Sequence, residues 1–158
     1  MIKVLFVCHG NICRSPMAEF LFKKFVKDKG VADKFLIESA ATSCEELGNP
    51  VYPPVRAILS GLNIDCSIKR ARRITEKDGA FDYLIGMDGA NIRNMQNFFG
   101  KTAEGQIFKM LDFTDGAKGQ DVADPWYTGD FNRALRDIEM GLNGFYDYLT
   151  KSGAIEKA

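Results

Sequence analysis

The chain of 158 residues has little of several residue types that would point to particular classes of protein. It holds one histidine, and its four cysteines show no C-x2-C pairs, so no metal motif is recognisable. No apolar run approaches the roughly 18 residues that a membrane span needs, and no apolar signal segment precedes the first predicted strand. We therefore expect a cytoplasmic protein that uses neither a metal nor another cofactor.

An excess of either charge is also missing. Lys and Arg together number 21, and so do Asp and Glu, so no broad basic surface for nucleic acid or for a membrane is expected. Internal repeats and low-complexity stretches that would divide the chain are absent as well. At this length we expect one domain, spanning residues 1–158, with a sizeable core.

The most informative stretch is residues 2–16. Residues 2–7 form a nearly continuous apolar run, which is typical of a strand buried on both faces of a parallel sheet. Ser15 is a good N-cap and Pro16 a good first helical residue, so a helix is predicted to begin there. The residues between them join the carboxyl end of a strand to a helix N-terminus. Free N–H groups and the positive end of the helix dipole favour an anion at such a junction.

Cys8 and Arg14 add chemistry to this anion site. A loop of this length can curl so that its N–H groups and the Arg14 guanidinium hold three oxygens of a phosphate, with the Cys8 sulfur beneath the phosphorus. The same dipoles favour the thiolate, which is the nucleophilic form of cysteine. Alone, Cys8 could be a buried structural thiol and Arg14 a surface charge. Together with Gly10, which permits close backbone approach, they favour a phosphate trap with an attacking group.

Predicted strands and helices alternate along the rest of the chain. Further strands are predicted at residues 35–40, 81–85 and 106–111, the last at the sheet edge, and helices at 16–29, 50–61, 92–99 and 131–149. This alternation predicts an α/β fold: a single-domain, four-stranded parallel sheet with helices on both faces, a flavodoxin-like three-layer sandwich. We take the strand order to be 2-1-3-4. The loop that begins at Cys8 then lies at the switch point of the sheet, where ligands bind.

Asp124 is the candidate proton donor. It lies in residues 112–130, a segment too long to be a mere connection, and Pro125 stiffens the backbone behind it. An alkoxide or phenolate expelled by Cys8 would need a proton, although an Asp-Pro pair by itself is more often a turn signal. Trp126 and Tyr127 follow directly. They would form an aromatic wall beside the trap or, in the simpler alternative, anchor the loop.

The stretch Val-Cys-His-Gly-Asn-Ile-Cys-Arg-Ser-Pro at residues 7–16 closely resembles the signature of the low-molecular-weight protein tyrosine phosphatases. The resemblance continues through residues 39–43, 48–50, 81–83, 87–88 and 124–127, and so covers nearly the whole chain in family order. It implies the strand order given above. It also implies a metal-independent phosphatase that hydrolyses phosphotyrosine and small aryl phosphates through a cysteinyl-phosphate.

The resemblance also assigns roles to particular residues. Cys8 would be the nucleophile, Arg14 the phosphate clamp and Asp124 the general acid and later the base. Asn11 in a strained turn, Ser15 bonded to the thiolate and, less directly, Ser39 would support the loop. The phosphate-binding residues would be His9, Gly10, Asn11, Ile12, Cys13, Arg14 and Ser15, and the substrate pocket would include Ile12, Glu45, Trp126 and Tyr127.

Several positions leave alternatives open. Cys13 lies close to Cys8 in a curled loop, and the resemblance implies a protective disulfide on oxidation, although a packing role is equally compatible with the sequence. His9 either tunes the pocket or faces solvent, and Asp88 is either a helix cap or a site residue. The family often has His where this chain has Lys69. Glu45 would make the pocket rim acidic, whereas the basic residues 69–73 would attract acidic peptides if they lay close.

The expected partners are phosphotyrosine-containing proteins, together with inorganic phosphate or other oxyanions as product-like ligands. Related bacterial enzymes that act on phosphoarginine tend to carry Thr in place of Ile12, so Ile12 favours phosphotyrosine. An arsenate reductase would need relay cysteines after Met87, and none follows it. A non-catalytic phosphate-binding module would need neither the Cys8 thiol nor the Asp124 carboxyl.

Overall fold

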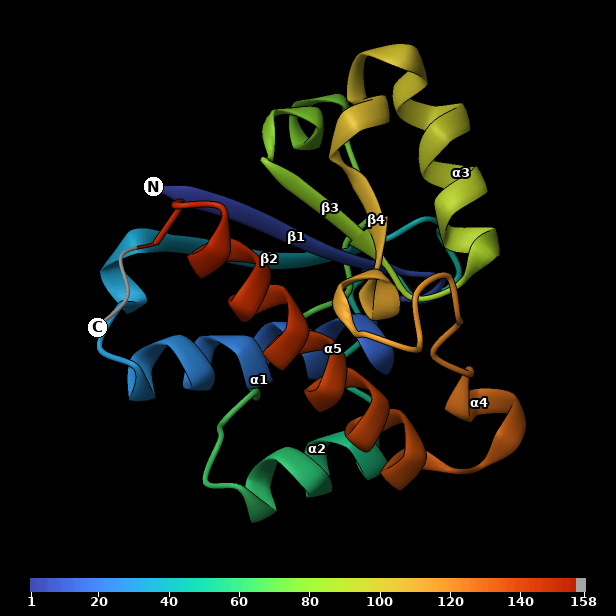
Figure 1. The fold of residues 1–158 in the computed structure, drawn as a ribbon. Helices are drawn as coiled ribbons and strands as arrows, with labels where there is room; N and C mark the ends of the chain where they lie inside the picture. The colour runs from blue at the N-terminus through green and yellow to red at the C-terminus, as the bar shows by residue number, and fades with distance from the viewer. Residues whose placement is uncertain (156–158) are drawn as a thin grey trace.

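The computed structural model describes residues 1–155, without the side chain of Thr102. Its strands are β1 (Ile2–Cys8), β2 (Phe35–Ala41), β3 (Tyr83–Gly86) and β4 (Ile107–Lys109). They form one parallel sheet in the order β2-β1-β3-β4, with β4 at an edge (Figure 1). The predicted fold class and strand order are confirmed.

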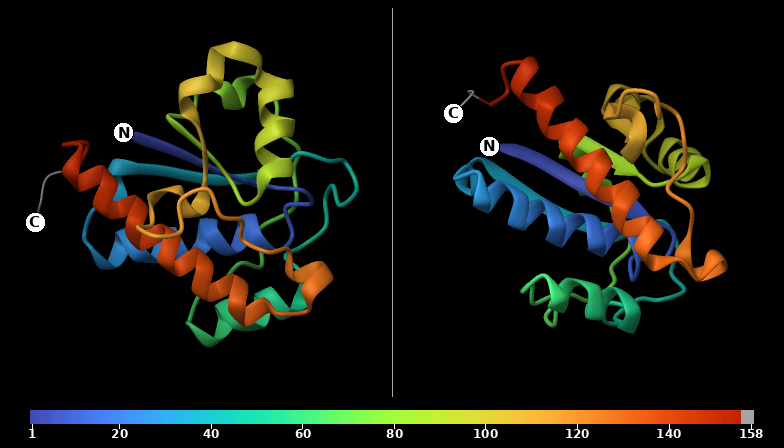
Figure 2. Two further views of the ribbon diagram at one scale, coloured as in Figure 1. Left: turned by 45° about the vertical axis from the view of Figure 1, so that its right-hand side comes forward. Right: turned by 60° about the horizontal axis from the view of Figure 1, so that its bottom comes forward.

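Helices cover both faces of this sheet (Figure 2). The α-helices are α1 (Arg14–Asp28), α2 (Pro53–Gly61), α3 (Gly89–Phe99), α4 (Pro125–Thr128) and α5 (Phe131–Lys151). Short 3₁₀ helices span Ala32–Lys34, Glu76–Ala80, Gly100–Gln106 and Met110–Phe113. In both views, α1 and α5 lie on one side of the sheet and α3 on the other. No helix in the described part of the chain combines the length and apolar character that a membrane span requires.

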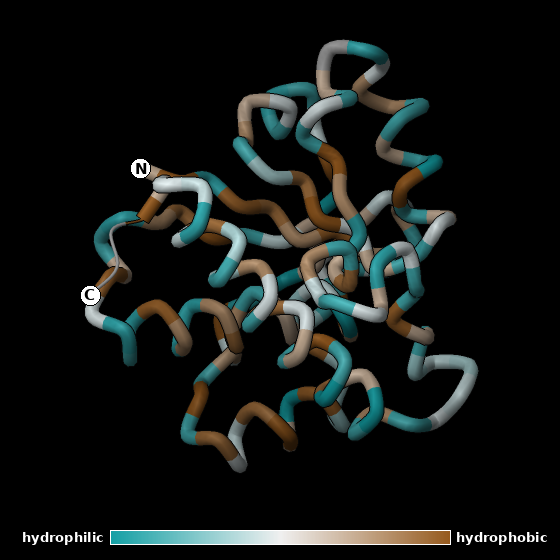
Figure 3. The backbone as a smooth tube through the Cα atoms, viewed as in Figure 1, coloured by the Kyte–Doolittle hydropathy of each residue, from teal (hydrophilic) through white to brown (hydrophobic). Residues whose placement is uncertain are grey.

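β1 is the centre of the core. Val4 and Phe6 point to the side of α1 and α5, whereas Leu5 and Val7 point to the side of α3, and all four are fully buried. Figure 3 shows the apolar colouring along the strands of the sheet. Because alternate side chains of a strand point to opposite faces, a continuous apolar run can be buried only when both faces are covered.

The predicted N-cap of the first long helix is wrong. α1 begins at Arg14 and its N-cap is Cys13, which makes no side-chain capping bond. Ser15 instead lies inside the first turn, where its hydroxyl is 3.0 Å from the Cys8 sulfur. The side chain that would have capped the helix is therefore turned toward the loop.

Other element boundaries shift by a few residues. The fourth strand is shorter than predicted, because the Asp112 carboxylate accepts the Lys109 N–H at 2.9 Å and the chain turns into a 3₁₀ helix. The predicted long loop at 112–130 contains the end of that turn and α4. The second helix begins at Pro53 rather than Pro50.

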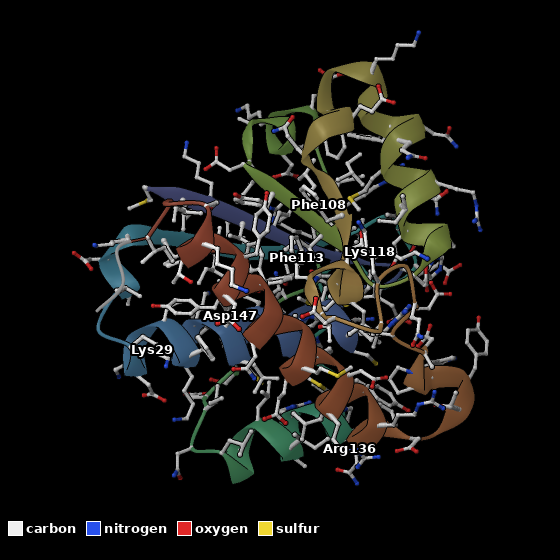
Figure 4. All side chains as sticks on the ribbon, viewed as in Figure 1. Lys29, Phe108, Phe113, Lys118, Arg136 and Asp147 are labelled. Carbon is white, nitrogen blue, oxygen red and sulfur yellow. The ribbon has the colours of Figure 1, made fainter. Side chains whose placement is uncertain are left out.

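α5 packs closely on the turn Met110–Phe113. A Cβ atom on Gly141 would lie 2.7 Å from the Met110 carbonyl oxygen, and one on Gly144 would collide with the Phe113 carbonyl. Phe113 in turn contacts Phe108 and Phe145, with ring centroids 5.2 and 4.9 Å apart. Figure 4 shows Phe108 and Phe113 beside α5 at the end of β4. Both glycines, which weaken a helix by themselves, permit this close approach.

Candidate active site

A pocket of about 120 Å³ opens where the carboxyl ends of β1 and β3 meet the N-terminus of α1. Its lining comes from the loop after β1, the loop after β2, and α4 with the residue before it. The lining residues are Cys8, His9, Gly10, Ile12, Cys13, Arg14, Glu45, Glu46, Asp124, Trp126 and Tyr127. The predicted residues Asn11, Ser15 and Ser39 are not in this lining, and each is at most 1% exposed.

The Cys8 sulfur lies at the end of β1 and is almost completely buried. It is 3.0 Å from the Ser15 hydroxyl, and the Asn11 N–H donates to it at 3.3 Å. Asn11 has a φ of 59°, in the left-handed region that few residues other than glycine adopt. Its backbone N–H is thereby directed at the sulfur, an arrangement that favours a negative charge there.

The side chain of Asn11 holds this loop in place. Its amide donates to the Ser15 hydroxyl at 2.8 Å and to the Ser39 hydroxyl at 2.9 Å. Its carbonyl oxygen accepts the Arg72 N–H at 3.1 Å. The Asn11 side-chain amide thus bonds to three segments, namely α1, β2 and the stretch that contains Arg72. These bonds offset the strain of the positive φ.

The network extends to a buried ion pair that sequence reasoning missed. The Ser39 hydroxyl donates to Glu19, and the Lys69 ammonium lies 3.6 Å from Glu19 and donates to the Ser39 carbonyl at 2.9 Å. Burial lowers the pKa of Lys69, while the neighbouring Glu19 carboxylate opposes this shift. Lys69 is therefore directed inward, behind the loop. No local pattern in the sequence pairs Glu19 with Lys69.

Arg14 is 2% exposed and is held in position by three groups. Its Nη1 donates to Asp88 and to the Val122 carbonyl, both at 2.8 Å, and its Nη2 lies 3.4 Å from Asp124. Burial would lower the pKa of Arg14, but Cys8 and Asp88 raise it by more. The guanidinium is therefore charged and fixed at the pocket floor.

Asp88 has both of the roles that the sequence left open. Its carboxylate caps α3 by accepting the Asn91 N–H at 2.9 Å, and it also binds Arg14. Burial would raise the pKa of Asp88, but the Asn91 N–H and the Arg14 guanidinium lower it by more. Asp88 remains ionised and orients the arginine.

Asp124 is the N-cap of α4, and its carboxylate accepts the Trp126 N–H at 3.0 Å. The other carboxylate oxygen is the one near Arg14. Trp126 contacts Tyr52, with ring centroids 5.0 Å apart, whereas Tyr127 is 85% exposed. Trp126 thus packs on Tyr52 although it is 53% exposed, and Tyr127 lies at the mouth of the pocket.

The loop after β2 brings acidic side chains to the mouth. Glu45 lies 3.0 Å from the His9 ring, so His9 takes part in the pocket rather than only facing solvent. Glu46, which sequence reasoning missed, accepts a hydrogen bond from the Asn49 amide at 2.6 Å. Its position beside Glu45 in the same loop was the available signal.

Cys13 differs sharply from Cys8, although both line the pocket. Burial, followed by the charges of Cys8 and Asp124, raises the pKa of Cys13 to about 12. Both sulfurs are free thiols in this structure. In residues 1–155, no group of three or more His, Cys, Asp or Glu side chains is gathered so as to hold a metal ion.

Comparisons with known proteins agree with this geometry. The family model "Low molecular weight phosphotyrosine protein phosphatase" matches residues 3–155. Low molecular weight protein-tyrosine-phosphatase YfkJ of Bacillus subtilis is 39% identical over 142 residues, which are 89% of this chain and 91% of that protein. The crystal structure of YfkJ from Bacillus subtilis superposes with a TM-score of 0.92 and 37% identity, covering 96% of each chain.

A second solved structure carries a phosphorylated residue. The YwlE arginine phosphatase, a mutant with a phosphorylated active-site serine, superposes with a TM-score of 0.81 and 25% identity. It covers 95% of this chain and 97% of its own, and YwlE comes from Bacillus subtilis. The family model spans nearly all of the sequence, and a relative well above 30% identity covers most of it. The chain therefore belongs to the low molecular weight phosphotyrosine protein phosphatase family.

Proposed function

We propose that this chain removes phosphate from phosphotyrosine in proteins, and from small aryl phosphates, by way of a phosphate ester on the Cys8 sulfur. One observation carries the proposal. The Cys8 sulfur, which accepts the Asn11 N–H and lies 3.0 Å from the Ser15 hydroxyl, shares one small pocket with the buried Arg14 guanidinium and the Asp124 carboxyl. Binding alone needs neither a thiol nor a proton donor, whereas phosphoryl transfer uses both.

In the first step, the Cys8 thiolate attacks phosphorus and a sulfur–phosphorus bond forms as the bond from phosphorus to the tyrosine oxygen breaks. The electron pair of the broken bond stays on that oxygen, and protonated Asp124 supplies the proton that converts it to a phenol. Arg14 and the loop N–H groups hold the other three phosphate oxygens. Asp88 supports this step by fixing the guanidinium.

In the second step, water attacks the phosphorus of the cysteinyl-phosphate. Asp124, now a carboxylate, takes a proton from this water, the sulfur–phosphorus bond breaks and its electron pair returns to Cys8. Inorganic phosphate leaves, and the thiolate and the protonated Asp124 are restored. The same carboxyl therefore acts first as acid and then as base, which its position beside Arg14 on the pocket lining permits.

The choice of phosphotyrosine rests on the apolar and aromatic walls of the pocket. Ile12 lines it with a methyl-bearing side chain, and Trp126 and Tyr127 offer rings against which a phenyl group can pack. The name of YfkJ as a tyrosine phosphatase supports this choice. YwlE, named an arginine phosphatase, makes phosphoarginine the alternative to test.

The first test uses the Cys8→Ser variant with a phosphotyrosine peptide and a matched phosphoarginine peptide. We expect wild-type protein to hydrolyse the phosphotyrosine peptide faster. The variant should lose hydrolysis and retain peptide binding, because serine keeps the size of the side chain without a thiolate. Rapid acid quenching of the wild-type reaction should trap phosphate on Cys8. Hydrolysis by Cys8→Ser at the wild-type rate would contradict the nucleophile assignment, and faster hydrolysis of phosphoarginine would contradict the assigned substrate.

A second test addresses Asp124. We expect Asp124→Asn to lower kcat on phenyl phosphate by about 10²- to 10⁴-fold. The loss should be smaller with a leaving group such as p-nitrophenolate, which needs less protonation. Equal loss with both leaving groups would contradict a role as proton donor. Asp130→Asn, which removes a carboxylate that caps α5, is the matched control.

Inorganic phosphate and other oxyanions are proposed as ligands of the same pocket. A cytoplasmic location and a protective disulfide between Cys8 and Cys13 also stay predictions from the sequence. The disulfide is tested by oxidising the protein with hydrogen peroxide, mapping its disulfides by mass spectrometry and measuring recovery of activity after addition of a thiol.

A further inference from the structure

The mouth of the pocket carries an acidic rim, formed by Glu45 and Glu46. Both residues belong to the loop that follows β2, and both line the pocket. The Glu45 side chain is 70% exposed, so it faces any polypeptide that reaches the pocket. The acidic rim lies beside Asp124, which makes three carboxyl groups at one opening.

Glu46 is fixed rather than free to turn away. Its stem packs against Gly10, where an added Cβ atom would lie 3.3 Å from the Glu46 Cγ atom. The Asn49 amide donates to its carboxylate at 2.6 Å. The carboxylate is also close enough to the pocket floor to contribute to the raised pKa of Cys13. Its charge is therefore held at the opening.

The nearby basic residues do not cancel this charge. None of residues 69–73 lines the pocket. Lys69 is directed inward to Glu19, and Arg72 binds Asp78 through two hydrogen bonds at 2.9 and 3.1 Å. Arg70 donates to the carbonyls of Ser67 and Lys69. Arg73 donates to the Thr42 carbonyl at 3.4 Å and lies 5.7 Å from the centre of the Phe98 ring, so none of these side chains has a bond to Glu45 or Glu46 among the described contacts.

Two basic side chains, Arg14 and His9, do line the pocket. Arg14 lies at the floor, buried and bound to Asp88. His9 is paired with Glu45 at 3.0 Å. One imidazole can balance at most one of the two carboxylates Glu45 and Glu46, so the acidic rim keeps a net negative formal charge.

We propose that the acidic rim selects phosphotyrosine segments that carry Lys or Arg next to the phosphotyrosine over segments that carry Asp or Glu there. This inference rests on the proposed function. A peptide whose phosphate occupies the loop around Arg14 has to pass its flanking residues over the mouth that Glu45 and Glu46 line. There opposite charges attract and like charges repel, and salt screens both effects because the Debye length is about 10 Å at 0.1 M salt.

The test compares two phosphotyrosine peptides that differ only in their flanks, one with Lys on both sides and one with Glu. At low ionic strength we expect kcat/KM to be roughly tenfold higher for the Lys peptide, and the ratio to fall toward one as salt is added. Phenyl phosphate, which has no flanks, is the reference for each protein. Failure to hydrolyse phenyl phosphate would contradict the proposed function. Equal rates on both peptides, with phenyl phosphate hydrolysed, would contradict this inference alone.

Charge-removing variants then assign the effect to residues. The ratio of kcat/KM for the Lys peptide to kcat/KM for the Glu peptide, measured within each variant, should fall severalfold in Glu45→Gln and in Glu46→Gln and approach one in the double variant. Glu45→Lys should invert it. Asp33→Asn removes one negative charge at the opposite end of β2 and should leave the ratio as in wild type. An unchanged ratio in the double variant, or an equal fall in Asp33→Asn, would overturn the assignment to the acidic rim.

Discussion

Two residues of one type, Cys8 and Cys13, have opposite environments within a single loop. The Cys8 sulfur accepts a hydrogen bond from the Asn11 N–H and lies beside the Ser15 hydroxyl. Cys13 is buried, with the negative groups Cys8, Asp124 and Glu46 near it, and its pKa is raised to about 12. Residue type and spacing alone do not reveal this difference, because it depends on which hydrogen-bond donors and charges the fold brings to each sulfur.

Alkylation of the native protein should distinguish these sulfurs. At pH 7 we expect iodoacetamide to modify Cys8 and the exposed Cys44, and to leave Cys13 unmodified because its thiol stays protonated. Peptide mass spectrometry after a time course measures each rate. Inorganic phosphate should slow the modification of Cys8 and not that of Cys44. Modification of Cys13 in the folded protein as fast as that of Cys8 would contradict this prediction.

Glu19 and Lys69 form a buried charge pair that supports the loop from behind. The Lys69 side chain is 12% exposed and the Glu19 side chain 5%, so removing one partner leaves the other charge poorly solvated. Lys69→Met should therefore lower the free energy of unfolding by about 1–3 kcal/mol, less than for a fully buried pair because Lys23 also contacts Glu19. Urea denaturation measures this loss.

Two further variants test whether this loss of stability comes from the charge pair. Lys69→Arg retains the charge and should recover most of the stability. The double variant with Glu19→Gln and Lys69→Met should lose less than the sum of the two single losses, because neither charge is then left alone. Additive losses would show that the two side chains are not coupled.

At the scale of elements, α5 shows why a helix keeps residues that weaken it. Gly141 and Gly144 each reduce helix stability by roughly 1 kcal/mol relative to alanine. They lie where α5 crosses the turn Met110–Phe113. The backbone of that turn leaves no room for a Cβ atom on either glycine. The same contact places Phe113 against Phe145 in the core.

We predict that Gly144→Ala destabilises the protein by about 1–3 kcal/mol, although alanine favours a helix, because its Cβ atom would meet the Phe113 backbone, which cannot move aside cheaply. Thermal or urea unfolding measures the change. Gly61→Ala is the matched control. Gly61 ends α2 with open space around its Cβ position, so no loss is expected there. Equal effects at the two positions would contradict the packing argument.

At the scale of the whole molecule, the site joins segments that lie far apart in the chain. Arg14 from α1 meets Asp88 at the start of α3 and Val122 before α4, residues that are 74 and 108 positions away. The parallel sheet produces this meeting, because the carboxyl ends of its strands lie at the same edge. A phosphate bound by Arg14 would therefore stabilise the fold as well as occupy the pocket.

Inorganic phosphate should raise the melting temperature of the wild-type protein. A ligand that binds only the folded state adds about 2.7 kcal/mol at 100 times its Kd, and each kcal/mol corresponds to roughly 2–4 °C for a chain of this size. Arg14→Lys should remove most of the shift, because a lysine ammonium cannot reproduce the planar fork of the guanidinium. Chloride at equal ionic strength is the salt control. Arg136→Lys, on the exposed surface of α5 (Figure 4), should retain the full shift. An undiminished shift in Arg14→Lys would contradict the role of Arg14 as the clamp.

Sequence reasoning predicted the alternation of strands and helices and the strand–loop–helix at Cys8, because both follow from apolar runs and from contiguous residues. The strand order 2-1-3-4, by contrast, was supported by the resemblance to the family. Sequence reasoning placed the N-cap of α1 two residues late, at Ser15 rather than Cys13, since capping preference does not reveal that the Ser15 hydroxyl lies against the Cys8 sulfur. It also extended β4 too far, since the bond from the Lys109 N–H to Asp112 competes with pairing in the sheet.

By itself the sequence determined the alternation of strands and helices and the loop from Cys8 to Ser15, because these depend on residues adjacent in the chain. Only the tertiary structure decided which distant groups serve that loop. Asp88 orients Arg14, the pair of Glu19 and Lys69 lies behind Ser39, and the acidic rim stands at the opening while the basic residues 69–73 stay outside the pocket. Those contacts join residues far apart in the chain, and no local sequence pattern predicts which of them meet. They form only when the sheet brings the carboxyl ends of its strands together.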